Sequence, residues 1–275
     1  MKTIKHCVLF LLLMTILPSL SQGQIKQKWN NYKDKRQVKK SEQTSYLVLE
    51  TGVTYSNNQD LSTSNQIYNG AGLGLSIGKF KESPKVIKDS ETIGVVNNFI
   101  SSQGGVSGFD WTVTSNYGHL FILNREAEQN WRVAVGPKVD ALGQVRLIPS
   151  LSNSSIHWDA MFSLGAAARV DRTIRLPLIK KEVSFYGEAH LPLVGYLNRP
   201  SYAIPGWEIE HTFGFIGRMN RLETEFGLIM PIRKNNPNLF RISYNWDVFN
   251  YRDNDIYKVT TGHHALSFAL LVNLR

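Results

Sequence analysis

The sequence predicts an all-β fold, an antiparallel β-barrel that spans a membrane. Three observations lead to this prediction: an export signal at the amino terminus, long segments of alternating polarity, and no later apolar run long enough for a membrane-spanning helix. Helices and closed barrels are the two structures that satisfy their backbone hydrogen bonds in a bilayer. A protein that crosses a membrane without such helices is therefore expected to form a barrel.

The first 23 residues have the organisation of a secretory signal peptide. A basic start is followed by an apolar run, Cys7 to Leu17, and then by small residues at Ser21 and Gly23. The apolar run is shorter than the roughly 20 residues that a membrane helix needs. The sequence therefore predicts a cleaved signal peptide over 1–23, with cleavage near Gly23.

The basic character of the chain is concentrated in one short segment. The formal net charge is +9, and residues 24–43 hold seven basic residues against two acidic ones. We interpret 24–43 as a basic leader and expect no nucleic-acid partner, because an exported chain seldom meets one. Cys7 is the only cysteine, so a chain without its signal peptide has no disulfide, thiolate metal site or cysteine nucleophile.

Residues 181–197 show the alternation most clearly. Odd positions carry Phe185, Leu191 and Leu193, whereas even positions carry Glu188 and His190. Successive side chains of a strand point to opposite faces, so one face is apolar and the other is charged. The segment is much longer than the 5 to 6 residues that are usual for a strand in a globular sheet.

The same rule predicts ten strands within 44–275, at 44–56, 66–80, 108–124, 131–147, 156–170, 181–197, 207–218, 221–232, 238–249 and 263–274. Ten is an even number, as bacterial single-chain barrels have. The interval from Lys81 to Ser107 is long for a loop, and Thr92 to Ile100 could form a further strand, which makes twelve the alternative count.

A secreted β-sandwich or jelly roll is the competing fold, because its strands also alternate. The apolar faces here are longer than a sandwich needs and suit spans of about 9 to 11 residues. Aromatic residues near strand ends, as in the girdles of membrane barrels, are Trp131, Tyr196, Trp207 and Trp246. Both features favour the barrel.

With its export signal, its alternation and a strand that runs to the carboxyl terminus, the sequence resembles the outer-membrane β-barrel proteins of Gram-negative bacteria. The resemblance covers about residues 44–275. It implies a location in the cell outer membrane, with membrane lipid as a partner and other envelope proteins as further candidates.

The polar faces of the predicted strands place many charges inside the barrel. Because unpaired buried charges are costly, the glutamates should pair with arginines across a narrow lumen that side chains largely fill. The proposed lumen cluster consists of Glu188, His190, Glu208, Glu210, Arg221, Glu223, Glu225, Arg241 and Asp247.

No motif in the sequence identifies a catalytic residue, a cofactor site or a metal site. His263 and His264 are adjacent, so on a strand they point to opposite faces and cannot chelate one ion. Glu188 and His190 share a face and could share a ligand, but pairing across strands is the simpler interpretation. We therefore expect no catalytic residue, cofactor or metal ligand.

These observations favour a non-enzymatic barrel with a polar, largely filled lumen and a structural or partner-binding role. Two alternatives remain open from the sequence. One is a lipid- or peptide-modifying enzyme with its site at the outer rim, and the other is a narrow channel for small solutes.

Overall fold

A computed structural model describes residues 43–61, 64–101, 105–124, 131–150, 156–176, 181–200, 209–233, 236–252 and 258–274. Residues from Thr44 onward form one compact unit. The expected signal peptide (1–23) and basic leader (24–43) lie outside the described residues except for Gln43. No helix in the described part of the chain is long and apolar enough to cross a membrane.

The described residues form eleven strands. They are β1 (Thr44–Asp60), β2 (Ser64–Glu82), β3 (Val86–Ser101), β4 (Ser107–Ile122), β5 (Trp131–Leu147), β6 (Ile156–Leu176), β7 (Lys181–Pro200), β8 (Ile209–Phe215), β9 (Met219–Pro231), β10 (Leu239–Arg252) and β11 (Lys258–Asn273). Most strands are long because the alternation of apolar and polar residues continues over the full height of the barrel wall.

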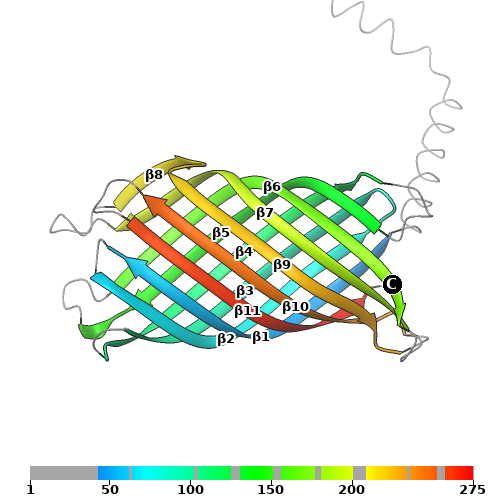
Figure 1. Cartoon of the computed structure of the whole chain (residues 1–275), viewed down its shortest axis with the longest axis horizontal. Coiled ribbons are helices and arrows are strands. Elements are labelled where there is room, and N and C mark those ends of the chain that lie inside the picture. Colours follow the sequence, from blue (N-terminus) through cyan, green and yellow to red (C-terminus); the bar gives the residue numbers. More distant parts are fainter. Residues whose placement is uncertain are drawn as a thin grey trace, which may run out of the picture. The chain divides into compact units, whose positions relative to one another are not determined.

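Ten of these strands close into a barrel. Antiparallel pairing runs from β1 through β7, passes to β9, β10 and β11, and returns to β1. Figure 1 shows these strands wrapping obliquely around the barrel axis. The closing pair is continuous from Tyr46 opposite Asn273 to Asp60 opposite Val259. The predicted ten-strand antiparallel barrel is confirmed, because the closed ring leaves no free edge along β1 or β11.

The membership of the ring differs from the sequence prediction in two strands, β3 and β8. β3 is a full member, paired with β2 and β4 over most of its length, although the sequence suggested only a possible strand at Thr92 to Ile100. The physical reason is that the first half of β3 points Lys88, Ser90 and Thr92 outward, so exposed apolar residues such as Val96 and Ile100 occur only in its second half. Polar residues on both faces conceal a strand from a search for alternation.

The segment predicted as a strand at 207–218 is not a member of the ring. β8 pairs only with the outer part of β7, from Val194 to Pro200. β9 pairs with the same edge of β7, but with an earlier part of it, from Ser184 to His190. A turn that contains Gly217, at a φ of 103°, connects β8 to β9. β8 therefore lies along the part of β7 that β9 does not reach, and it is the last strand of the described sheet on that edge of β7.

A bulge in β7 reverses the facing that the sequence predicted for its last residues. Leu164 of β6 pairs with Val194, whereas the next residue, Gly165, pairs with Pro192, so Leu193 is an extra residue. Beyond it Leu197 is buried at 2% exposure and Tyr196 points outward at 38%. The strict alternation predicted the opposite, because one inserted residue inverts every side chain that follows it.

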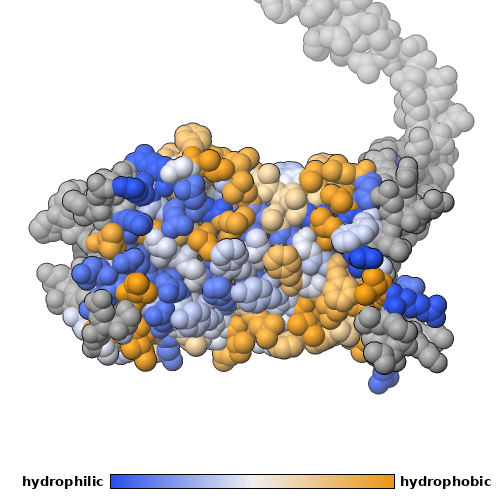
Figure 2. Space-filling view, in the orientation of Figure 1, coloured by the Kyte–Doolittle hydropathy of each residue, from blue (hydrophilic) through white to orange (hydrophobic). Residues whose placement is uncertain are grey.

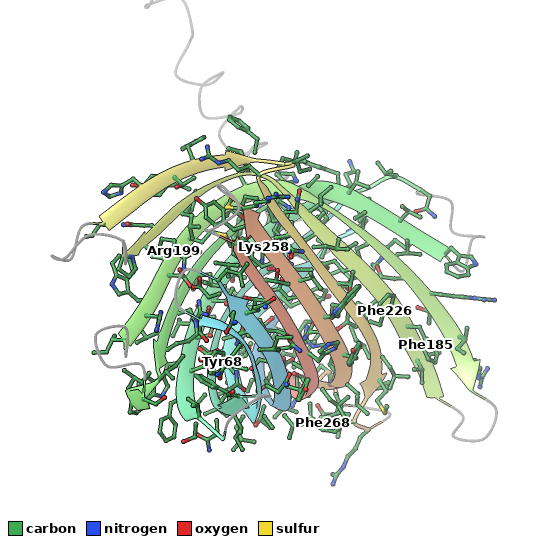
Figure 3. The ribbon with its side chains drawn as sticks, turned by 60° about the vertical axis from the view of Figure 1, so that its left-hand side comes forward. Tyr68, Phe185, Arg199, Phe226, Lys258 and Phe268 are labelled. Atoms are coloured by element: carbon green, nitrogen blue, oxygen red, sulfur yellow. The ribbon has the colours of Figure 1, made fainter. Side chains whose placement is uncertain are left out.

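The outer wall of the barrel is apolar and its inner wall is polar. Leu73 and Leu75 are 66% and 69% exposed, which is unusual for leucine in a folded protein in water. On the face seen in Figure 2, hydrophobic side chains cover much of the wall, and hydrophilic ones gather mainly toward the end where β10 finishes. Phe185, Phe226 and Phe268 point outward from three different strands (Figure 3).

Glycine allows close approach between β2 and β3. A methyl group added to Gly72 would collide with the Val96 carbonyl oxygen and the Asn97 side chain of β3, whereas one added to Gly143 on β5 would meet nothing within 4 Å. We predict that Gly72→Ala lowers the free energy of unfolding by about 1–3 kcal/mol because of overpacking. Gly143→Ala should change it by less than about 0.5 kcal/mol.

Equilibrium unfolding of the refolded protein in denaturant would measure both changes. Equal effects of the two substitutions would contradict the placement of β3 beside β2.

Candidate functional site in the barrel interior

Apolar side chains close the interior at the end where β1 begins and β11 ends, which we call the terminal end. They form one packed cluster made of Val48, Phe80, Ile87, Leu120, Ile122, Ala134, Ala167, Ala269 and Leu271. Leu120 is completely buried and Phe80 is 6% exposed. The inward positions near this end thus form an apolar floor beneath the charged residues.

A mixed layer closes the opposite end, which we call the far end. Arg199 of β7 forms an ion pair with Asp60 of β1 and lies 3.5 Å from Asp159 of β6, which also pairs with Arg146. Two apolar clusters accompany these pairs: Tyr68, Phe99 and Ile148, and Met161, Leu197, Met219, Tyr251 and Val259. Both ends of the interior are therefore occupied by packed side chains.

Between the two ends, arginine and lysine side chains organise the carboxylates into three groups. In the first, Lys138 Nζ lies 2.9 Å from Glu188 Oε1, and Arg169 bridges Glu188 and Asp171 at 3.5 and 2.9 Å. The Arg169 guanidinium also lies over the Tyr186 ring, 4.1 Å from its centre. A buried cation is thus held by charge and by the ring face.

The second group surrounds Arg241 of β10. Its Nη2 donates to Glu50 Oε2 at 2.5 Å and lies 3.6 Å from Glu91 Oε1, and its Nη1 lies 3.8 Å from Glu225 Oε1. Glu91 also accepts from Ser76, and Glu225 accepts from the Tyr186 hydroxyl. One guanidinium therefore serves three carboxylates, which come from β1, β3 and β9.

The third group surrounds Arg221 of β9. The guanidinium donates to Asp140 Oδ2 at 2.6 Å and to Asp247 at 2.9 to 3.3 Å, and it forms an ion pair with Glu223. His190 of β7 lies against the same carboxylates, with its Nδ1 3.1 Å from Glu223 Oε2. These contacts join β5, β7, β9 and β10 across the lumen.

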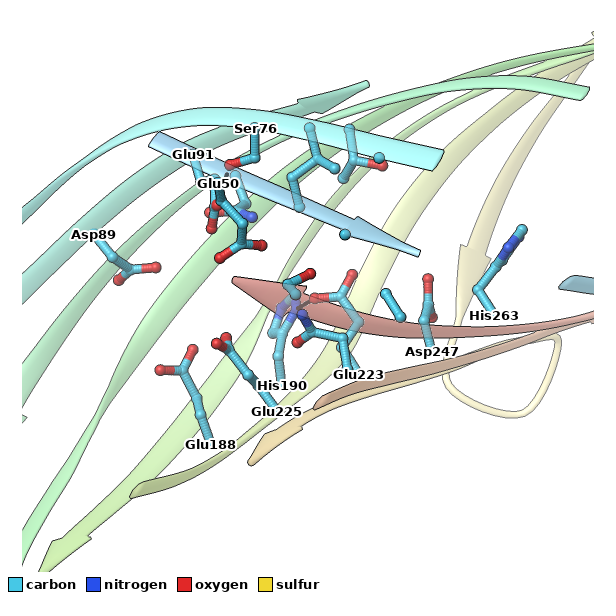
Figure 4. A pocket seen from close by; sticks show the side chains of 18 of the residues that line it. Glu50, Ser76, Asp89, Glu91, Glu188, His190, Glu223, Glu225, Asp247 and His263 are labelled. Atoms are coloured by element: carbon cyan, nitrogen blue, oxygen red, sulfur yellow. Dashed lines mark hydrogen bonds and ion pairs between the residues drawn. The ribbon is translucent and has the colours of Figure 1, made fainter. Parts of the chain in front are cut away.

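A cavity of about 180 Å³ remains between the three groups. Carboxylates from several strands line it, and Gly52, Gly74 and Ser267 leave room between them. Figure 4 shows the carboxylates of Glu188, Glu223 and Glu225 directed into this space. The sequence predicted a largely filled lumen; side chains pack both ends of the interior, and small residues on β1, β2 and β11 leave this cavity between them.

Most of the predicted cluster lies together around this cavity. Glu188, His190, Arg221, Glu223, Glu225, Arg241 and Asp247 all border it. Glu208 and the side chain of Glu210 lie outside the described residues. The predicted pairing of glutamates with arginines is confirmed for Arg169, Arg221 and Arg241.

The predicted cluster omitted several acidic members of the network. Asp89 and Glu91 lie on β3, whose strand character the sequence did not establish, and Glu50 lies on the first strand. The sequence could have indicated Asp89 and Glu91, because both occupy odd positions, and the odd positions from Ile87 to Phe99 point inward. Asp140 is buried on β5, and its contact with Arg221, 81 residues away, depends on barrel closure.

A closed antiparallel barrel with an apolar outer wall and a polar interior is the architecture of outer-membrane β-barrel proteins. The chain has this architecture, which confirms the fold-level resemblance drawn from its sequence. No family model matches the sequence, and no curated protein matches it.

Several solved structures of bacterial outer-membrane proteins are similar at low identity. The transport unit of the autotransporter AIDA-I from Escherichia coli is 10% identical over 83% of this chain and 89% of its own, with a TM-score of 0.45. Neisserial surface protein A is 13% identical over 82% and 96%, with a TM-score of 0.35. Ail of Yersinia pestis, solved with the heparin analogue sucrose octasulfate, is 13% identical over 83% and 99%, with a TM-score of 0.32.

Arg241 offers a test of the network. We predict that Arg241→Ala lowers the free energy of unfolding by about 3–5 kcal/mol, because it leaves the buried Glu50 and the partly buried Glu91 and Glu225 without their shared cation. Arg233→Ala removes the same charge from an exposed turn and should change it by less than about 0.5 kcal/mol. Thermal and denaturant unfolding in detergent would measure both, and equal stabilities of the two variants would contradict the network.

Proposed function

We propose that the chain functions in the outer membrane of a Gram-negative bacterium as a non-enzymatic barrel without an open pore, in a structural or partner-binding role. The observation that carries this proposal is an interior closed by packed side chains at both ends within an apolar wall. Membrane lipid is then the partner of the wall. Export would require the predicted signal peptide over 1–23, cleaved near Gly23.

The far end carries a feature that supports a partner-binding role. Among the described strands, β8 pairs on one side only, with β7. Phe213 and Phe215, on its outward face, are 60% and 63% exposed. An open strand edge beside an apolar surface is suited to pairing with a strand of another protein. Another envelope protein is the partner that fits this position.

A narrow channel is the second candidate, because the cavity between the charged groups could be part of a gated path. Such a path would be open only if the packed side chains at the terminal end and those at the far end moved apart at the same time. Conductance measurements distinguish this candidate from a closed barrel.

The location can be tested by fractionation. Because the exposed leucines and phenylalanines of the wall require an apolar environment, the protein should sediment with outer membranes and need detergent for release. Its mobility on a denaturing gel should change after boiling, since a closed barrel resists unfolding at room temperature. A soluble monomer recovered without detergent would refute the location.

Conductance tests the closed interior. The wild-type barrel should show no measurable conductance in planar bilayers. Opening one end should not be enough for conductance, either at the floor (Phe80→Ala with Leu120→Ala) or at the far layer (Phe99→Ala with Arg199→Ser). The variant that combines all four substitutions should conduct ions. Steady conductance by the wild-type protein would refute the closed interior, and heat-dependent gel mobility would confirm that each variant is folded.

A further inference from the structure

Asp140, His190 and Glu223 form a group within the charged interior that ion pairing alone does not explain. They come from β5, β7 and β9, and one potential ligand atom of each lies within 4.8 Å of the other two. His190 Nδ1 is 3.1 Å from Glu223 Oε2 and 3.7 Å from Asp140 Oδ1. His190 and Asp140 are each 1% exposed, whereas the Glu223 side chain, which borders the cavity, is 20% exposed.

We propose that these three side chains bind one divalent transition-metal ion, with Zn²⁺ as the best-fitting candidate. Ligands at about 2.0–2.2 Å from a tetrahedral zinc ion are roughly 3.3–3.6 Å from one another, close to the separations from His190. One imidazole and two carboxylates suit zinc and its first-row neighbours, whereas calcium and magnesium prefer oxygen ligands alone.

The charge of the surrounding cavity favours a bound cation. Seven carboxylates and five basic side chains border it, and Asp140, which pairs with Arg221, raises the acidic count to eight. Buried carboxylates without a counter-charge are strongly disfavoured. A divalent ion at this site would offset two of the three excess negative charges.

His190 provides an observation that does not depend on the carboxylates. Its Nε2 has no hydrogen-bond partner among the described residues, although the side chain is almost completely buried and borders the cavity. When Nδ1 binds a metal ion, the remaining nitrogen carries the proton and needs an acceptor. Water in the cavity meets that need, since 180 Å³ exceeds by about tenfold the 10–15 Å³ required for one molecule.

Arg221 orients the two carboxylates for this purpose. Its Nη1 contacts Asp140 Oδ2 at 2.6 Å, and its Nη2 contacts Glu223 Oε1. The other oxygens, Oδ1 and Oε2, therefore face His190. Ser163 donates to Asp140 Oδ1 at 2.7 Å and leaves a second lone pair on that oxygen. Such outer contacts are typical around metal ligands and fix their orientation.

The experiment uses the full barrel, purified without a polyhistidine tag, stripped with EDTA while unfolded, and refolded in detergent over a series of Zn²⁺ concentrations, so that the ion need not pass the packed ends. Metal analysis after removal of free ions should give one zinc per chain, and refolding with Co²⁺ should produce a visible absorption band of a site with nitrogen and oxygen ligands. Zinc should also raise the thermal midpoint of the wild-type protein, a result that requires no variant.

Matched variants separate a specific site from general attraction to an acidic cavity. His190→Gln and Glu223→Gln should each weaken zinc binding at least about tenfold. Glu91→Gln removes one carboxylate from the same cavity but no ligand, and should weaken it less than about threefold. Heat-dependent gel mobility would confirm that each variant is folded.

Three results would overturn the proposal: no zinc binding by the wild-type protein, an equal loss in Glu91→Gln and His190→Gln, or displacement of zinc by equimolar Ca²⁺. If the wild-type protein binds no zinc, His190 is only a hydrogen-bond partner of Glu223. Either of the other two results would mean that cations are held by the general negative charge of the cavity and not by these three ligands.

Discussion

Charge that is buried inside a narrow closed barrel must be compensated within that barrel, and the interior is organised by this constraint. Alternation directs every second side chain of ten strands inward, where a polar group has no access to bulk water. Arg169, Arg221 and Arg241 each serve at least two carboxylates from different strands. These contacts join strands far apart in the sequence, so the network and the closure of the barrel depend on each other.

The need to compensate buried charge inside the barrel also limits which functions the interior can serve. Packed layers at both ends separate the charged centre from the surroundings, which disfavours simple diffusion of solutes through the lumen. Small residues such as Gly52, Gly74 and Ser267 nevertheless leave a cavity beside the acidic wall. A barrel filled only for stability would not need an excess of carboxylates at its centre, since ion pairs gain little over well-packed apolar residues. The proposed cation would bind in this acidic cavity, and the proposed partner would pair with the free edge of β8 at the far end.

The sequence was informative where the two faces of a strand differ sharply. On β11, which covers most of the predicted strand 263–274, Leu266, Phe268 and Leu270 alternate with buried residues, and β6 behaves in the same way. β3 was harder to recognise because its outer face carries Lys88, Ser90 and Thr92. A single inserted residue, Leu193, inverts the end of β7, and no composition signal marks such a bulge. The grouping of Asp140 with His190 and Glu223 follows from barrel geometry, which residue spacing alone does not specify.

Thiol accessibility tests the enclosed interior most directly, because Cys7 is the only native cysteine and can be replaced by serine. In that background Ser267→Cys places one thiol at the cavity, and Asn57→Cys places one on the exposed outer surface near the far end. With the barrel folded in lipid vesicles, a small charged thiol reagent should modify position 57 rapidly and position 267 only after unfolding. Equally rapid modification of both positions in the folded barrel would contradict a sealed interior.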